Sequence, residues 1–452
     1  MATEYRFPHG FLWGTATSAH QIEGDNQASD WWEYEQQGRL SHQSGDACRH
    51  YQDYERDFDL AQSLGQNAHR FSIEWSRIEP VPGGWDEGAL EHYQRVVAAL
   101  RTRNLEPLVT LHHFTNPAWF LRRGGWARRD SVELFARYVR RVADALAPSV
   151  KYWLTINEPT VYVMEGYILG DWPPRLTRAW VRAAIVLRHL ARAHVVARRV
   201  LRERRSDAMV SFAHSAPVIQ PCDPARLRDR WAAALRDAVL NRVFFRWIGA
   251  RPNATRPTDA LDFVAINYYT RHVVRSAGVG LGLLVGRDCR QPHHGDDGPR
   301  SDMGWEVYPA GLTHTLERFS RYGVPIIITE NGIATDDDRL RRTFVKRHVA
   351  AMGEAIDRGV DVRGYCHWSL IDNFEWAFGR TVRFGLAAVE FATQERTLRP
   401  SAHDFAQVCR DNRVARARAG DSAEFPSASM SLVGQFQAGI ATGAADAPPV
   451  DY

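Results

Sequence analysis

The chain contains few cysteines, and they are widely spaced. Five occur among 452 residues, and no two form a C-x-x-C pair: Cys48, Cys222, Cys289, Cys366 and Cys409. An odd number of scattered cysteines argues against a disulfide framework and against a cysteine-based zinc site. We therefore expect free thiols and a reducing compartment, which favours a cytoplasmic location.

Lysine is rarer still. Lys151 and Lys346 are the only two, so arginine supplies almost all of the positive charge, and the formal net charge is +4. The densest basic stretch, 339–348, alternates with apolar residues at helical spacing, which predicts a solvated helix face. We read this as a composition bias and expect no nucleic-acid partner. The oligomeric state is not indicated by any pattern in the sequence.

Long apolar runs and nucleotide-binding motifs are also missing. No run approaches the roughly 20 residues that a membrane span needs. Residues 1–10 lack the basic and apolar regions of a signal peptide, so we expect neither a leader nor a membrane anchor. No G-x-G-x-x-G follows the first apolar run and no G-x-x-x-x-G-K-[ST] occurs, which argues against the usual nucleotide-binding folds.

What the chain does contain is an alternation of short apolar runs with longer segments of helical period. Continuous apolar runs are typical of buried parallel strands, and the helices between them imply right-handed crossovers. Eight such units predict an α/β fold, a closed (β/α)8 TIM barrel formed as a single domain by residues 1–412. The tail 413–452 is rich in Ala, Gly, Ser and Pro, and we expect it to be flexible or loosely packed. The eight runs are 11–16, 68–73, 107–111, 152–156, 209–212, 261–266, 325–328 and 362–365.

Polar and aromatic residues occur at or just after the ends of these runs. In such barrels the carboxyl ends of the strands meet at one rim, where the active site lies. We therefore expect these side chains to gather there. They are Gln21, Arg70, His112, His113, Asn157, Glu158, His214, Asn267, Tyr268, Tyr269, Glu330, His367 and Trp368.

Glu158 and Glu330 are two carboxyl groups that the barrel would bring to the same rim. Cleavage of a glycosidic bond needs one protonated carboxyl group to give a proton to the leaving oxygen. It also needs one ionised carboxylate that attacks the anomeric carbon or activates water there. As a hypothesis, Arg70 keeps Glu330 ionised, and Glu158 stays protonated until the bond breaks.

Seven segments resemble glycoside hydrolase family 1, the β-glucosidases and their relatives. They appear in the order typical of that family and span about residues 5–410. The pair LTINEP and ITENG is the most specific part of the resemblance. The segments are FPHGFLWGTATSAHQIEG at 7–24, RFSIEWSR at 70–77, LHHFTNPAWF at 111–120, LTINEP at 154–159, INYY at 266–269, ITENG at 328–332 and HWSLIDNFEW at 367–376.

The resemblance implies a retaining mechanism with Glu158 as acid/base and Glu330 as nucleophile, at a carboxyl separation of about 5–5.5 Å. It implies a small β-glucoside or oligosaccharide as the substrate, and neither a metal nor an organic cofactor. It also assigns further residues. The residues expected to bind the sugar are Gln21, His113, Asn157, Trp368, Glu375 and Trp376. Those expected to support them are Arg70, Asn267 and Tyr269. Trp126 and Phe384 would line the walls or the entrance on the aglycone side.

The chain departs from the family pattern at a few positions. His20 stands where the family usually has tyrosine, next to Gln21, and DWPP at 171–174 replaces a more typical pattern of small residues and proline. The stretch between Asn241 and Asp262 also looks short. These departures bear on aglycone preference rather than on the two glutamates.

Two alternatives stay open from the sequence. A 6-phospho-β-glycosidase would have to bind a phosphate dianion near C6, where the carboxylate of Glu375 would repel it. A non-catalytic glycan-binding barrel would be expected to lack one of the two carboxyl groups, and both are present. The sequence does not distinguish glucose from galactose, fucose or mannose, and it leaves transglycosylation open as a side activity.

Overall fold

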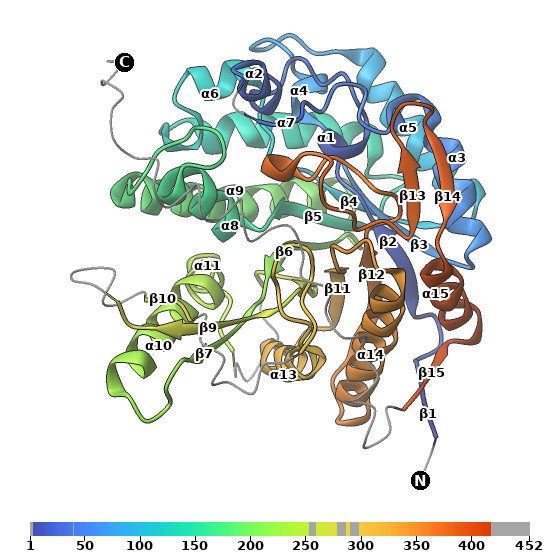
Figure 1. The fold of residues 1–452 in the computed structure, drawn as a ribbon. Helices are drawn as coiled ribbons and strands as arrows, with labels where there is room; N and C mark the ends of the chain where they lie inside the picture. The colour runs from blue at the N-terminus through green and yellow to red at the C-terminus, as the bar shows by residue number, and fades with distance from the viewer. Residues whose placement is uncertain (1–2, 39, 253–258, 278–285, 290–297, 417–452) are drawn as a thin grey trace.

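The computed structural model describes residues 3–38, 40–252, 259–277, 286–289 and 298–416, and its centre is a closed barrel of parallel strands (Figure 1). Around the barrel the strands follow the order β11-β12-β2-β3-β4-β5-β6-β8. The predicted (β/α)8 barrel is confirmed, and each strand overlaps one predicted run. The strands are β2 Leu12–Ala16, β3 Ala68–Ser72, β4 Glu106–Thr110, β5 Tyr152–Asn157, β6 Met209–Ser215, β8 Val264–Asn267, β11 Ile326–Asn331 and β12 Val362–Trp368.

Helices surround these strands (Figure 1). In α7 (Ser131–Leu146), Phe135, Val139, Val142 and Leu146 share one face and are buried. This apolar face packs against the interior while the polar face meets solvent. The other long helices are α3 His50–Ser63, α5 Glu87–Thr102, α9 Trp180–Arg204, α10 Leu227–Asn241, α13 Pro309–Phe319, α14 Asp338–Asp357 and α15 Pro400–Asp411. The short ones are α1 Ala19–Ile22, α2 Asp30–Gln36, α4 Trp75–Ile78, α6 Ala118–Arg122, α8 Pro159–Val163, α11 Val243–Trp247, η1 Gly125–Ala127, η2 Met164–Leu169, η4 Ser320–Tyr322 and η5 Trp376–Phe378.

The basic stretch 339–348 lies in α14, but it is only partly a solvated face. Arg341 and His348 are fully buried. The Arg341 guanidinium donates to Asp338 Oδ1 at 2.9 Å and to the carbonyl oxygen of Arg383 at 3.0 Å. The prediction is wrong for these two residues, because helical spacing does not reveal which polar side chains find buried partners. Separately, no helix among the described residues is long and apolar enough to cross a membrane.

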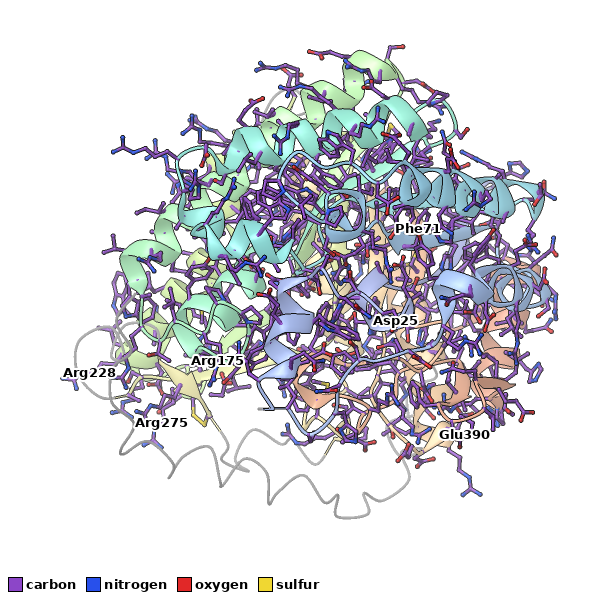
Figure 2. All side chains as sticks on the ribbon, turned by 90° about the horizontal axis from the view of Figure 1, so that it is seen from above. Asp25, Phe71, Arg175, Arg228, Arg275 and Glu390 are labelled. Carbon is purple, nitrogen blue, oxygen red and sulfur yellow. A yellow bond between two sulfur atoms is a disulfide. The ribbon has the colours of Figure 1, made fainter. Side chains whose placement is uncertain are left out.

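Three smaller sheets lie outside the barrel in the described part of the chain, and the sequence did not predict them. In one of them, β15 pairs with β1, so residues 413–415 of the predicted tail form a strand. Residues 417–452 lie outside the described residues, and for them the predicted flexible or loosely packed tail stays a prediction. Arg275 at the end of β9 and Glu390 of β13 lie at opposite edges of the molecule (Figure 2). The sheets consist of β1 Glu4–Arg6 with β15 Arg413–Ala415, β7 Val218–Pro221 with β9 Arg271–Arg275 and β10 Arg287–Asp288, and β13 Ala387–Glu390 with β14 Glu395–Leu398.

Cys222 and Cys289 form a disulfide between the segments that follow β7 and β10. The expectation of five free thiols is therefore wrong for this pair. The two cysteines are 67 residues apart in sequence, and β9, which lies between β7 and β10, brings both ends together. Cys48, Cys366 and Cys409 are free and buried. The disulfide removes the cysteine argument for a reducing compartment.

Candidate active site

The two predicted catalytic carboxyl groups lie at the carboxyl ends of barrel strands. Glu330 belongs to β11, and Glu158 directly follows β5. The pairing register shifts at both places, between Leu154 and Asn157 on β5 and after Ile328 on β11. Such irregularities re-aim side chains next to active sites. The backbone thus leaves the regular ladder at the two points where the carboxyl groups occur.

The backbone of Glu158 is in the left-handed region, at φ 41° and ψ 60°. A non-glycine residue there costs roughly 1–3 kcal/mol and persists only where its surroundings fix it. The Glu158 N–H donates to the carbonyl oxygen of Ala213 on β6 at 2.8 Å, and Pro159 begins α8. The strained turn is therefore anchored to the next strand on one side and to a helix start on the other.

Glu330 receives a donor on each carboxylate oxygen. Arg70 Nη1 donates to Oε1, and the Tyr269 hydroxyl donates to Oε2 at 2.6 Å. Burial, followed by the charge of Glu330, raises the pKa of Tyr269 well above its ordinary value, so this hydroxyl keeps its proton. Two donors, one of them cationic, stabilise the ionised form of Glu330.

Glu158 has a different environment. Burial, and then the nearby charge of Glu330, raise the pKa of Glu158 to about 8. One amide donor, Asn267 Nδ2 at 2.9 Å from Glu158 Oε1, acts in the opposite direction. At neutral pH Glu158 is therefore mainly a neutral carboxylic acid facing a charged carboxylate.

Asn157 and Asn267 join the surroundings of the two carboxyl groups. Arg70, which contacts Glu330, also donates from Nη2 to Asn157 Oδ1 at 2.7 Å. Asn267 Nδ2, which contacts Glu158, lies 3.1 Å from the same Asn157 oxygen. Both carboxyl groups therefore border one hydrogen-bonded network, and the charge of Glu330 raises the pKa of Glu158.

A second polar group contains Gln21 and Glu375. Gln21 Nε2 donates to Glu375 Oε2 and to Asn373 Oδ1, both at 3.1 Å, while Ser18 Oγ donates to Gln21 Oε1 at 2.6 Å. Burial and then the charge of Glu330 raise the pKa of Glu375 to about 8. The Glu375 carboxyl group is thus held by Gln21 and lies within the electrostatic influence of Glu330.

Aromatic rings lie next to these polar groups. The imidazole of His113 stacks on Trp368 and on Trp376, with ring centroids 5.9 and 6.2 Å apart. Burial lowers the pKa of His113 well below its ordinary value, so the ring is neutral. Its Nε2 lies 3.2 Å from Asn157 Nδ2, and its Nδ1 has no partner among the described residues. A buried ring nitrogen without a partner can bind a sugar hydroxyl.

Gly332, the glycine of ITENG, directly follows β11 and lies against Trp368 at the end of β12. A Cβ at this position would lie 1.8 Å from the backbone oxygen of Trp368. Only glycine fits this approach. It lets the strand that carries Glu330 end directly beside the tryptophan predicted to form the floor under the sugar.

The structure does not bring all predicted residues to the site. Trp126 has no exposed surface, donates from Nε1 to Asn116 Oδ1 at 2.9 Å and packs on Phe120 and Phe135. An entrance position for Trp126 is therefore wrong, because the ring belongs to the packing between the barrel and its helices. Phe384 is also buried, but it lies against Tyr269, with ring centroids 6.2 Å apart.

Three residues of the strand-end series point away from the carboxyl groups. His214 contacts Asn241 of α10, with 3.1 Å between Nε2 and Oδ1. The Tyr268 hydroxyl donates to the backbone oxygen of Tyr308 at 2.6 Å. The His367 ring packs on Phe405 of α15. These side chains join barrel strands to the outer helices, as alternation along a strand requires of neighbouring residues.

Sequence reasoning missed several residues that hold the site. Ser18 and Asn373 orient Gln21. The ring centroids of Trp31 and Trp172 lie 4.7 and 5.7 Å from that of Trp376. Trp172 falls in the DWPP segment noted as a departure, which was the only signal for it. Ser18 and Asn373 lie inside the segments 7–24 and 367–376 that carry the family resemblance, but no role was predicted for them, and Trp31 had no signal.

A cavity of about 750 Å³ lies between α10 and α13. Asp237 in its lining forms ion pairs with Arg242 and Arg318, and Phe319 and Tyr322 supply apolar surface. None of the predicted site residues lines it. The hollow is thus separate from the carboxyl pair.

A (β/α)8 barrel with two dissimilar carboxyl groups and buried polar and aromatic neighbours at its rim is the arrangement typical of a glycoside hydrolase. The model of the glycosyl hydrolase family 1 matches residues 3–258 and 250–414. The chain belongs to this family, and it is a retaining β-glycosidase.

Relatives of known name agree with this membership. Beta-glucosidase A of Thermotoga maritima is 31% identical over 450 residues, covering 90% of this chain and 98% of that protein. A beta-galactosidase of Pyrococcus woesei is also 31% identical, covering 91% and 98%. The solved structure of a beta-glycosidase from Pyrococcus horikoshii is 40% identical, with a TM-score of 0.82 and coverage of 91% of this chain and 96% of that one.

Proposed function

We propose that Glu330 is the nucleophile and Glu158 the acid/base in hydrolysis of a terminal, non-reducing β-D-glycosyl residue, with β-glucosides as the main substrates. The proposal rests on one observation, the unequal environments of the two carboxyl groups. Arg70 and Tyr269 donate to Glu330, whereas burial and the charge of Glu330 raise the pKa of Glu158 to about 8. An ionised nucleophile facing a protonated acid is the starting state of a double displacement.

In the first step Glu330 Oε attacks the anomeric carbon while Glu158 gives its proton to the glycosidic oxygen, and the aglycone leaves as an alcohol. The glycosyl ester that forms at Glu330 is neutral. The charge of Glu330 raises the pKa of Glu158, so loss of that charge lowers it. Glu158 can then accept a proton from a water molecule as that water attacks the anomeric carbon. The Glu330 carboxylate leaves, the sugar is released, and both carboxyl groups return to their starting states.

The remaining predicted residues bind the sugar in this proposal. Asn157 holds the 2-hydroxyl, and His113 uses its unpartnered Nδ1. Gln21 and Glu375 bind the hydroxyls farther from the anomeric carbon, and Trp368 forms the floor. Trp376 and Asn267 complete the surroundings.

A 6-phospho substrate is disfavoured at this site. Among the described residues, the influences on the pKa of Glu375 are burial, Glu330, Gln21 and Trp368, and none of them is a cation. A phosphate dianion placed there would lie near the charge of Glu330, and none of these neighbours would compensate its own charge. We therefore expect activity on 4-nitrophenyl β-glucoside and none on its 6-phosphate.

The direct test follows hydrolysis of 4-nitrophenyl β-glucoside by proton NMR. We expect the β-anomer of glucose to appear first and the α-anomer only through later mutarotation. Prompt release of α-glucose would contradict the double displacement. A panel of nitrophenyl glucoside, galactoside, fucoside and mannoside then ranks the sugars. A cytoplasmic location remains a prediction and is tested separately by cell fractionation.

A further inference from the structure

Trp376 has a strained backbone. Its φ is 49°, in the left-handed region that a bulky residue rarely adopts. The indole is 4% exposed and therefore enclosed by its neighbours. Such a conformation persists only where the surroundings fix it. The rings packed around Trp376 are those of His20, Trp31, His113, Phe114 and Trp172.

His20 makes the most parallel contact in this group. Its imidazole lies at 8° to the indole plane, with centroids 5.9 Å apart. Both ring nitrogens are hydrogen bonded: Nε2 lies 2.8 Å from Glu35 Oε1, and Nδ1 lies 3.1 Å from Asn26 Nδ2. Glu35 is itself fixed, because its Oε2 accepts from the N–H and the hydroxyl of Ser44 at 2.7 and 2.6 Å. The plane on which Trp376 rests is therefore held at both ends.

His20 and Gln21 are consecutive residues of α1, which follows β2, and they contact two consecutive residues that follow β12, the strand paired with β2. His20 stacks on Trp376, while Gln21 Nε2 donates to Glu375 Oε2 at 3.1 Å. Neither Glu35 nor Asn26 contacts the catalytic pair in the described residues. The His20 ring thus contacts Trp376 directly and is linked to Glu375 through the adjacent Gln21, whereas no contact joins it to Glu158 or Glu330 in the described part of the chain.

We propose that the buried His20–Glu35 pair is a positioning element that sets the discrimination between C4 epimers of the terminal sugar. The inference rests on the proposed function, in which Gln21, Glu375 and Trp376 surround the hydroxyls farthest from the reacting carbon. Glucose and galactose differ only in the direction of one such hydroxyl. A shift of these side chains by a fraction of an ångström changes which epimer is bound well.

The test compares kcat/KM for 4-nitrophenyl β-glucoside with that for the β-galactoside. His20→Gln removes the stacked ring but keeps one donor and one acceptor for Glu35 and Asn26. We expect the glucoside-to-galactoside ratio to change by about 10-fold, the usual range for a displaced polar contact. The change should appear mainly in KM, with a much smaller effect on kcat, because His20 does not contact Glu158 or Glu330 among the described residues.

A matched control is His50→Gln. His50 is a second buried histidine paired with a carboxylate, Asp57 Oδ2 at 2.7 Å from Nδ1, and it does not contact Trp376. It should lower the unfolding temperature without moving the ratio. Glu35→Gln keeps the ring but weakens its anchor, and we expect a smaller change of ratio in the same direction.

A His20→Gln enzyme that is folded and keeps the wild-type ratio within about twofold would overturn the inference. Should that variant not fold, the same result for Glu35→Gln overturns it. His20→Tyr offers a rescue, because an aromatic ring returns to the face of Trp376, and its ratio should lie closer to wild type than that of His20→Gln. A wild-type enzyme inactive on both substrates would instead contradict the proposed function.

Discussion

Glu158, Glu330 and Glu375, three glutamates at the predicted sugar site, carry the same carboxyl group but have different neighbours. Glu330 has an arginine and a tyrosine hydroxyl as donors. Glu158 and Glu375 are buried, and each lies within the field of Glu330, so their pKa values rise to about 8. Burial, reinforced by the charge of Glu330, therefore keeps Glu158 and Glu375 mainly protonated at neutral pH. The division of roles depends on this asymmetry.

Replacement of Tyr269 by phenylalanine tests the donor to Glu330. Loss of a hydrogen bond to a charged group is worth about 1.5–3 kcal/mol, so kcat should fall by roughly 10- to 100-fold while the overall fold remains. Steady-state kinetics and thermal unfolding measure both effects. Tyr268→Phe is the control. The Tyr268 hydroxyl donates to the backbone oxygen of Tyr308 at 2.6 Å, and this hydrogen bond does not involve Glu330. Tyr268→Phe should lower stability by about 1 kcal/mol and leave kcat unchanged.

The raised pKa of Glu158 predicts a basic limb in the pH profile. Glu158 is protonated below about pH 8 and loses its proton above that value, so kcat/KM for an alkyl glucoside should fall as the pH rises through this range. A dinitrophenolate leaves without being protonated. With a dinitrophenyl glucoside, the part of the decrease in kcat/KM at high pH that is due to Glu158 should therefore vanish. Glu158→Gln should remove the same part, whereas Glu375→Gln should not. A limb unchanged by leaving group would contradict the acid role of Glu158.

At the residue scale, the positions of the chemical groups were predictable but their orientation often was not. The residues at the ends of the apolar runs included Glu158, Glu330, Asn267 and Tyr269, which all reach the site. The same positions included His214 and Tyr268, which turn outward, because the face of each side chain depends on register. Trp126 was misplaced because a tryptophan in the core and one at an entrance look alike in sequence.

At the scale of elements, the barrel could be predicted from the alternation of apolar runs with segments of helical period. The eight apolar runs matched the barrel strands because parallel strands are buried on both faces. The sheet β7-β9-β10 and the hairpin β13-β14 were missed, since their half-exposed strands lack continuous apolar runs. The Cys222–Cys289 disulfide was missed with them, because the pairing of β7, β9 and β10 brings together two cysteines that are 67 residues apart in sequence.

The contact between the ends of β11 and β12 can be tested at Gly332. A Cβ in Gly332→Ala would collide with the Trp368 carbonyl, so the strand ends must separate. We expect a loss of about 1–3 kcal/mol in stability and up to about 100-fold in kcat/KM, since a 1 Å misplacement has that effect. Gly298→Ala is the matched control, because a Cβ added there would have no neighbour within 4 Å in the described part of the chain. Equal activity of both variants would contradict the role given to the close approach.

At the scale of the whole molecule, barrel closure turns separation in sequence into proximity. β12 pairs with β2, and β11 pairs with β8. The residues predicted to surround the sugar thus come from the first, middle and last parts of the chain. Gln21 and Glu375 are 354 residues apart and share a hydrogen bond.

The cysteines give a chain-wide prediction that is independent of activity. Titration of the denatured, unreduced protein should find three reactive thiols, from Cys48, Cys366 and Cys409. Titration after reduction should find all five cysteines of the sequence. Five thiols before reduction would contradict the Cys222–Cys289 disulfide. The double variant Cys222→Ser/Cys289→Ser should give three thiols under both conditions.

The central claim is that Glu330 forms a covalent bond with the sugar while Glu158 handles the proton. A 2-deoxy-2-fluoro-β-glucoside with a good leaving group slows the second step and traps that bond. Peptide mapping by mass spectrometry should then locate the sugar on Glu330, in the segment 328–332, with one label per chain. A label on Glu158, or rapid turnover without any trapped intermediate, would contradict the account.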